Sequence, residues 1–255
     1  MSVQARFAAI AAAGGRAAVV TVLSDGAHQG AKLLVLPDGA HEGTLGDAAL
    51  DDAAVRHATE LLWAEYSERR EEGDTTLFVD VVHPPPRLLV FGAVDYARAL
   101  CTLARDTGWR AFVIDPRGRF ATPERFPDAE AVVAAWPDKA VPQVGGIDPA
   151  TAIAVLTHDP KLDDAALTLA LRSGAGYIGA MGSRRAQADR RARLLEAGMT
   201  EEEIGRIKAP IGLDLGGLSA EETALSIMAE VVAARHGRAG GMLSASGGRI
   251  HEVRT

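Results

Sequence analysis

The segment LLVFGAVDYARAL, from Leu88 to Leu100, decides the fold of the larger part of this chain. An apolar strand runs directly into Gly92, and helix-forming residues follow it. A doubly wound nucleotide-binding fold begins in this order, with the turn and the helix start facing a phosphate. Val94 stands where the dinucleotide fingerprint has its second glycine, and Asp95 adds negative charge. The turn Gly92–Ala93–Val94 is therefore either a modified phosphate site or a helix start kept for packing.

Short apolar strands alternate with helices after HPPP, residues 83–86. The expected strands are RLLVFG (87–92), RAFVID (110–115), AIAVLTH (152–158) and GYIGAM (176–181), with helices beginning at Asp95, Pro160 and Arg184. The alternation predicts an α/β fold: a Rossmann-like, doubly wound parallel sheet whose ligand crevice lies at the carboxyl ends of the strands. Consecutive prolines cannot join a helix or a central strand, so we place a linker at residues 83–86 and this domain at residues 87–255.

Residues 1–82 predict a smaller α+β domain. RAAVVTVL (16–23) and AKLLVL (31–36) have the composition of strands and flank a turn-rich segment. Apolar residues at helical spacing predict a long amphipathic helix from Asp47 to about Arg70. TTLFVDVV (75–82) then alternates as a strand does.

Composition excludes several classes of protein. The chain has 255 residues and a formal net charge of -7, which argues against a nucleic-acid-binding surface. It contains no apolar run of the roughly 18 residues that a membrane-spanning helix needs. Cys101 is the sole cysteine, which excludes an internal disulfide and fits a cytoplasmic location. The seven histidines are scattered without the spacing of metal ligands, so we predict no metal site.

Polar residues end two further strands of the predicted sheet. Asp115 follows Gly92 at about the sequence separation that is typical of the acidic residue that holds a ribose hydroxyl in such folds. The alternative is a loop aspartate that precedes Pro116. Thr157, His158 and Asp159 end another strand and can bond the polar edge of a ligand, or Asp159 can simply cap the next helix.

The segment GYIGAMGSRR carries the strongest binding signal. We assign to the ligand site the residues that end this strand and begin the next helix: Gly179, Met181, Gly182, Ser183, Arg184 and Arg185. Arginines in a first helical turn oppose the helix dipole unless an anion offsets them, so Arg184 and Arg185 predict a phosphate clamp. We expect them to face the crevice beside Gly92 and His158. The alternative is a solvated basic helix that continues to Arg193.

Three segments resemble the family of xanthine dehydrogenase accessory proteins, also called the CoxI type. They read VLTHDPKLDDAAL, GYIGAMGSRRAQADRRARLLEAGMTEEEI and APIGLDLGGLSAEETALSIMAEVV, and GRAAVVTVL with GAKLLVLPDG resembles the amino-terminal region of the same family. The resemblance implies a cytoplasmic chaperone that binds molybdenum cofactor, assists its sulfuration and delivers it to a xanthine dehydrogenase-like or carbon monoxide dehydrogenase-like apoenzyme. The second branch implies the cytosine dinucleotide form of the cofactor. The expected partners are that molybdenum hydroxylase, a cysteine desulfurase and a second copy of the chain, and the expected role is cofactor binding rather than catalysis.

The sequence departs from the family pattern in three loops. Family members usually carry a cysteine in a glycine-rich loop after the first hairpin, where this chain reads HEGTLGDAALDDAAV (41–55). The loop SDGAHQ (24–29) is short, and the turn after Phe91 is GAVD rather than glycine-alanine-glycine-histidine. Handling of the cofactor through a thiolate is therefore not expected, since Cys101 should lie inside a helix and pack in the core.

Two other functions compete with the cofactor carrier. The fold alone is compatible with an oxidoreductase that uses NAD or NADP, although Val94 would crowd the pyrophosphate and no hydride-transfer pair stands out. The third is a divergent scaffold that binds the partner enzyme and has lost the ligand, which the altered loops favour.

Overall fold

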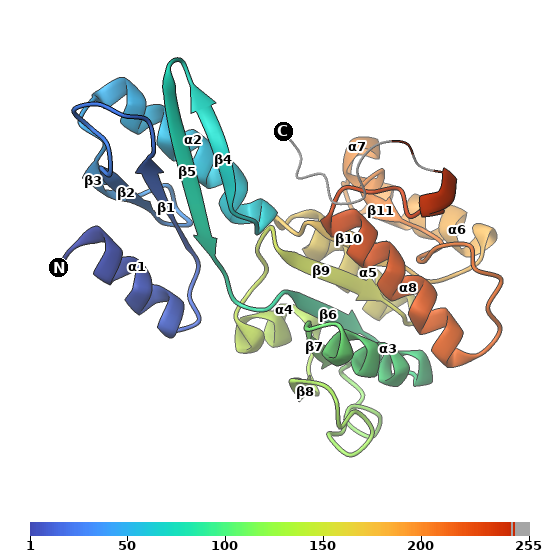
Figure 1. Ribbon diagram of the computed structural model, residues 1–255. Helices are drawn as coiled ribbons and strands as arrows, with labels where there is room; N and C mark the ends of the chain where they lie inside the picture. The colour runs from blue at the N-terminus through green and yellow to red at the C-terminus, as the bar shows by residue number, and fades with distance from the viewer. Residues whose placement is uncertain (246, 248–255) are drawn as a thin grey trace. The chain divides into compact units, whose positions relative to one another are not determined.

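The computed structural model of the protein describes residues 1–245 and 247. The chain divides into two compact units, the first spanning Met1–Pro84 and the second beginning at Pro85 (Figure 1). The boundary falls within the proline run, where the chain cannot continue either a helix or a sheet ladder.

The first unit is an antiparallel sheet with a helix on each face. Its elements are α1 (Val3–Ala12), β1 (Ala17–Val22), β2 (Lys32–Val35), β3 (His41–Thr44), α2 (Ala48–Ala64), β4 (Glu68–Glu72) and β5 (Thr75–Val82). The strands lie in the order β3-β2-β1-β5-β4. Because successive strand residues point to opposite faces, one set packs on α2 and the other, around Val19 and Leu34, packs on Phe7 of α1.

The helix predicted from Asp47 to about Arg70 is shorter than expected. Glu65 has a φ of 61° in the left-handed region and ends α2 after Ala64. Residues 68–72 instead form β4, which pairs with β5 in a hairpin turned at Gly73 (φ 57°). The five charged residues ERREE can form this strand because β4 lies at an edge of the sheet, where Arg69 and Glu71 reach solvent. The more buried Arg70 and Glu68 pair with each other at 2.8 Å.

The second unit is a doubly wound parallel sheet, which confirms the predicted fold class. Its strands are β6 (Arg87–Phe91), β7 (Arg110–Ile114), β8 (Ala131–Val133), β9 (Thr151–Val155), β10 (Tyr177–Ala180) and β11 (Ile207–Lys208). Its helices are α3 (Asp95–Asp106), α4 (Pro137–Ala140), η1 (Val141–Val144), α5 (Pro160–Leu171), α6 (Arg184–Glu196), α7 (Glu201–Ile204), α8 (Ala220–Arg235) and η2 (Leu243–Ala245). The strand order β8-β7-β6-β9-β10-β11 is that of the Rossmann fold.

Helices cover both faces of this sheet. Leu88 and Val90 of β6 pack with α3 and α8 on one face, while Leu89 and Phe91 pack with α5 and α6 on the other. Figure 1 shows α3 and α8 side by side on their face. The direction of winding reverses between β6 and β9, so the crevice that such folds use for ligands opens at the ends of these two strands.

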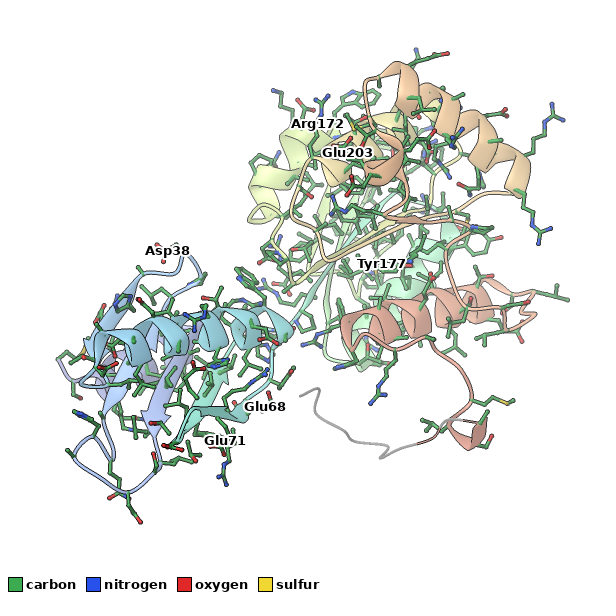
Figure 2. The ribbon with its side chains drawn as sticks, turned by 90° about the horizontal axis from the view of Figure 1, so that it is seen from above. Asp38, Glu68, Glu71, Arg172, Tyr177 and Glu203 are labelled. Carbon is green, nitrogen blue, oxygen red and sulfur yellow. The ribbon has the colours of Figure 1, made fainter. Side chains whose placement is uncertain are left out.

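Tyr177, labelled in Figure 2, ties β10 to α8. Its hydroxyl donates a hydrogen bond to Glu230 Oε2 at 2.6 Å, and the Gly212 amide donates to the same oxygen at 2.7 Å. Burial and the Glu230 carboxylate raise the pKa of the Tyr177 phenol, so it stays a hydrogen-bond donor. Among the described residues, no helix is long and apolar enough to cross a bilayer.

Candidate functional site

Gly92 brings the ends of β6 and β9 into contact. Its φ is 114°, and a Cβ atom at this position would lie 3.0 Å from the backbone nitrogen of Thr157. Side-chain-bearing residues avoid this conformation, and the neighbouring backbone cannot move aside cheaply. Glycine is therefore required at the turn both by conformation and by close packing, and the predicted site residues Gly92 and Thr157 do meet.

Both backbone polar groups of Ala93 form hydrogen bonds with side chains. Its N–H donates to Asp115 Oδ2 at 2.8 Å, and its carbonyl accepts a hydrogen bond from Arg125 Nη1 at 3.2 Å. Helix α3 then begins at Asp95, and its N-cap residue Val94 supplies no side-chain hydrogen bond. The Ala97 N–H donates to the Val94 carbonyl at 3.0 Å, and the exposed carboxylate of Asp95 stands at the same helix start, which makes it a weak site for an anion.

Asp115 lies at the expected end of β7, but its carboxylate is already engaged. Besides the Ala93 N–H, it accepts hydrogen bonds from the backbone N–H, Nε and Nη2 of Arg117, at 2.9, 2.9 and 2.7 Å. Burial alone would raise the pKa of Asp115, but the bonds from Arg117 and Ala93 outweigh it and lower the pKa. The carboxylate is thus ionised and holds a turn in place, and it is not free for a ribose hydroxyl as the sequence predicted.

A pocket of about 180 Å³ lies at the carboxyl ends of β9 and β10. Four predicted site residues line it: Thr157, His158, Met181 and Gly182. The others are Pro160, Asp163, Ala186, Asp189, Arg190 and Arg193. Thr157 is buried and its hydroxyl accepts from the Asp159 N–H at 2.9 Å, while His158 is exposed. Asp159 caps α5 by accepting from Lys161 N–H at 2.9 Å, so its capping alternative holds.

The two guanidinium groups that line the pocket are paired with carboxylates. Arg190 Nε donates a hydrogen bond to Asp163 Oδ2 at 2.7 Å. Its Nη2 forms an ion pair with the same oxygen at 2.6 Å and donates a hydrogen bond to the Met181 carbonyl at 2.8 Å. Arg193 pairs with Asp164 through Nε at 2.7 Å and Nη2 at 3.1 Å. Burial raises the pKa of Asp163, against the opposing effect of Arg190. The pocket is therefore close to neutral and does not by itself attract an anion.

Arg184 and Arg185 do not line this pocket. Both side chains are exposed at the start of α6, just after the pocket-lining Gly182, and neither forms an ion pair or hydrogen bond with another described residue. Ser183 caps α6 by accepting from the Ala186 N–H at 3.2 Å. The expected inward-facing clamp is thus not formed, because these side chains leave the first turn toward solvent.

Gly179 lies away from the pocket. A Cβ atom there would lie 2.4 Å from Ile211 Cδ1 and 2.6 Å from the Tyr177 hydroxyl, so this glycine makes room for packing within the sheet. A larger cavity of about 410 Å³ adjoins Tyr177, Arg206 and Arg238, and it holds none of the predicted site residues.

Sequence reasoning missed the buried pair Asp163 and Arg190. A signal was present, since Asp163 shares one face of α5 with the apolar Ala166, Leu167 and Ala170. Arg190 likewise lies one turn before the buried Leu194 of α6. Charged residues on an apolar helix face are rare and are paired when buried.

Cys101 lies on the buried face of α3, as expected, with no exposed surface. Burial, aided by the negative charge of Asp128, raises the pKa of its thiol to about 12. We expect Cys101 in the native protein to react with a thiol reagent such as DTNB at least about a thousandfold more slowly than free glutathione at pH 8. Unfolding in guanidinium chloride should release the full equivalent of thiol. Reaction of the native protein within minutes would contradict this burial.

The second unit is a Rossmann-type domain with a polar pocket beside its topological switch point. The model of the XdhC Rossmann domain matches residues 88–231, and the model of the XdhC and CoxI family matches residues 10–71. The chain belongs to the XdhC and CoxI family.

Named relatives are similar over part of their length. A protein of Bacillus subtilis, described as the probable A subunit of xanthine dehydrogenase, is 32% identical over 63% of this chain and 46% of its own. The molybdenum cofactor insertion chaperone PaoD of Escherichia coli is 31% identical over 60% of this chain and 41% of its own. The chain thus aligns with less than half the length of these relatives. A crystal structure described as a xanthine dehydrogenase, from Bacillus halodurans, shares the fold over 94% of this chain and 65% of its own, with a TM-score of 0.60 and 24% identity.

Proposed function

We propose that this protein binds molybdenum cofactor and assists its insertion into a xanthine dehydrogenase-like or carbon monoxide dehydrogenase-like molybdenum hydroxylase. The observation that carries the proposal is the polar pocket at the ends of β9 and β10, in a chain of the XdhC and CoxI family. The relative named as a molybdenum cofactor insertion chaperone supports the same role.

The residues present fit the cofactor in two places. The pocket volume of about 180 Å³ is smaller than the roughly 300 Å³ of a typical small-molecule site, so the pocket suits one ring system rather than the whole cofactor. The start of α6 offers free N–H groups with the unpaired guanidinium groups of Arg184 and Arg185, which suit a phosphate. We place the ring in the pocket and the phosphate at the pocket mouth, beside these arginines.

Delivery of the cofactor, rather than sulfur chemistry by this chain, is the role that we infer. The sole cysteine is buried with a raised thiol pKa, so it cannot carry sulfur in the native fold. Sulfuration would then need a cysteine desulfurase acting on the bound cofactor. The cytosine dinucleotide form and a homodimer also belong to this proposal.

Two observations disfavour an oxidoreductase that uses NAD or NADP. The Asp115 carboxylate is engaged by Arg117 and Ala93 and is not free for a ribose. Val94 also keeps a side chain at the position where the pyrophosphate approaches the backbone.

The proposal is tested by the cofactor content of the protein purified from cells that make molybdenum cofactor. We expect molybdenum by mass spectrometry, and pterin fluorescence after acid oxidation, in amounts that approach one per chain. The double variant Arg184→Ala/Arg185→Ala should lower both by about tenfold or more, because two charge-assisted contacts to the phosphate are lost.

The matched control is Arg98→Ala/Arg172→Ala, which removes two other exposed arginines of the same unit; Arg172 is labelled in Figure 2. This control should keep the cofactor. Absence of molybdenum and pterin from the wild type would contradict the proposed function. If such a protein still bound a molybdenum hydroxylase, it would be the scaffold that has lost its ligand.

A further inference from the structure

One carboxylate oxygen of a pocket-lining residue lacks a hydrogen-bond donor among the described residues. Asp163 lines the pocket with only 4% of its surface exposed, and the hydrogen bond and the ion-pair contact from Arg190 both go to its Oδ2. Its Oδ1 is buried and finds no hydrogen-bond partner among the residues that the structure describes. A buried carboxylate oxygen without a donor is costly, and each such group in a native protein calls for an explanation.

The surroundings of Asp163 indicate what is missing. Arg190 fixes the carboxylate from one side by binding Oδ2 and the Met181 carbonyl, and Arg193 is neutralised by Asp164. The other carboxylate that lines the pocket belongs to the exposed Asp189. A pocket with paired cations and a spare carboxylate oxygen favours a neutral ligand that donates a hydrogen bond over a second anion.

Gly182 brings α6 close to the end of β10 at the same wall of the pocket. A Cβ atom at this residue would lie 3.2 Å from Ala186 Cβ, 3.4 Å from Gln187 Nε2 and 3.8 Å from Arg190 Nη2. With a φ of 132° and neighbours this close, the position requires glycine. The close packing helps to fix the first turns of α6, and with them the Arg190 side chain that holds Asp163 in place.

We propose that Asp163 Oδ1 accepts a hydrogen bond from the amino-substituted edge of the heterocycle of the cofactor, with Arg190 as the positioning residue. This inference rests on the proposed function. In a pterin, the 2-amino group is a hydrogen-bond donor in the plane of the ring and can donate to the one carboxylate oxygen that Arg190 leaves without a partner. The 4-amino group of cytosine, in the dinucleotide form, offers the same donor chemistry.

The experiment compares ligands that differ at the amino group. Pterin is compared with lumazine, in which an oxygen replaces the 2-amino group, and cytidine monophosphate is compared with uridine monophosphate. Affinities are measured by titration calorimetry. The wild type should prefer the amino member of one pair by about tenfold or more, and the pair that shows the preference identifies the ring.

Asp163→Asn is the decisive variant, because it keeps the shape and replaces an acceptor with a donor. With its amide oxygen still facing Arg190, its NH₂ group takes the position of Oδ1. The preference should fall to parity or reverse toward the oxo member. Glu196→Gln, which changes an exposed carboxylate of α6 outside the pocket, should leave the preference unchanged.

Thermal unfolding of Asp163→Asn verifies that the variant is folded. The inference does not depend on this variant alone, since a wild type that fails to discriminate within either pair would overturn it. An unchanged preference in folded Asp163→Asn would also overturn it. If either of these results is found while the wild type still copurifies with cofactor, only the role of Asp163 is contradicted. If the wild type carries no cofactor, the proposed function is contradicted as well.

Discussion

Arg190→Ala is expected to lower the free energy of unfolding by about 3 to 5 kcal/mol, because it leaves the buried Asp163 carboxylate without a positive partner. The two side chains are each 5% exposed, so water cannot replace the lost guanidinium without opening the structure. The substitution also removes the bond to the Met181 carbonyl. Urea denaturation followed by circular dichroism measures the change.

Arg193→Ala is the matched control for this prediction. Arg193 lines the same pocket, but its side chain and that of its partner Asp164 are 34% and 30% exposed, so the loss should stay within about 1 kcal/mol. If Arg190→Ala were no more costly than Arg193→Ala, the buried pair would not have the weight that we give it.

The loss of unfolding free energy in Arg190→Ala should depend on pH. Burial already raises the pKa of Asp163 in the wild type, and loss of Arg190 raises it further. The pKa of Asp163 in the folded variant lies above the unfolded value of about 3.9. The loss of unfolding free energy is therefore fully present at pH values above the raised folded-state pKa. It should shrink as the pH falls toward about 3.9, where the carboxyl is protonated in the folded state.

Gly92→Ala is expected to cost about 3 kcal/mol of stability and to abolish binding in the crevice. The new Cβ would meet the Thr157 backbone at 3.0 Å, and a φ of 114° is strained for any residue with a side chain. Relief of the clash must separate the ends of β6 and β9. Chemical denaturation and the cofactor content of the purified variant report the two effects.

Gly108→Ala serves as the comparison. Gly108 follows α3, has a φ of 79°, and a Cβ there would meet nothing within 4 Å. The cost should be about 1 kcal/mol, from the left-handed conformation alone, with cofactor retained. Equal costs for the two variants would mean that the contact with Thr157 is not tight.

The fold of the second unit could be predicted from the sequence because its strands are short apolar runs with helices between them. The turn at Gly92 and the helix caps at Asp159 and Ser183 could also be predicted, because turns and caps depend on residues that are close in the sequence. Strand β4 could not be predicted in this way. ERREE becomes a strand only by pairing with β5 across a hairpin, a partner that its own composition does not indicate.

The candidate site was predictable in position but not in detail. The sequence placed Thr157, His158 and Gly182 at the ends of adjacent strands, and the structure brings them into one pocket. The sequence could not show that the Asp115 carboxylate is bonded to Arg117, or in which direction the side chains of Arg184 and Arg185 point. Those outcomes depend on tertiary partners and side-chain direction, and residue order carries little information on either.

Two hydrogen bonds of the Ala93 backbone fix the turn after β6, which forms one wall of the crevice, before a ligand binds. A ligand that touches this wall loses no affinity to ordering it. Under the proposed function, adaptation to the ligand would then fall on the start of α6, where the side chains of Arg184 and Arg185 are untethered. We expect the turn after β6 to keep the same conformation with and without the cofactor.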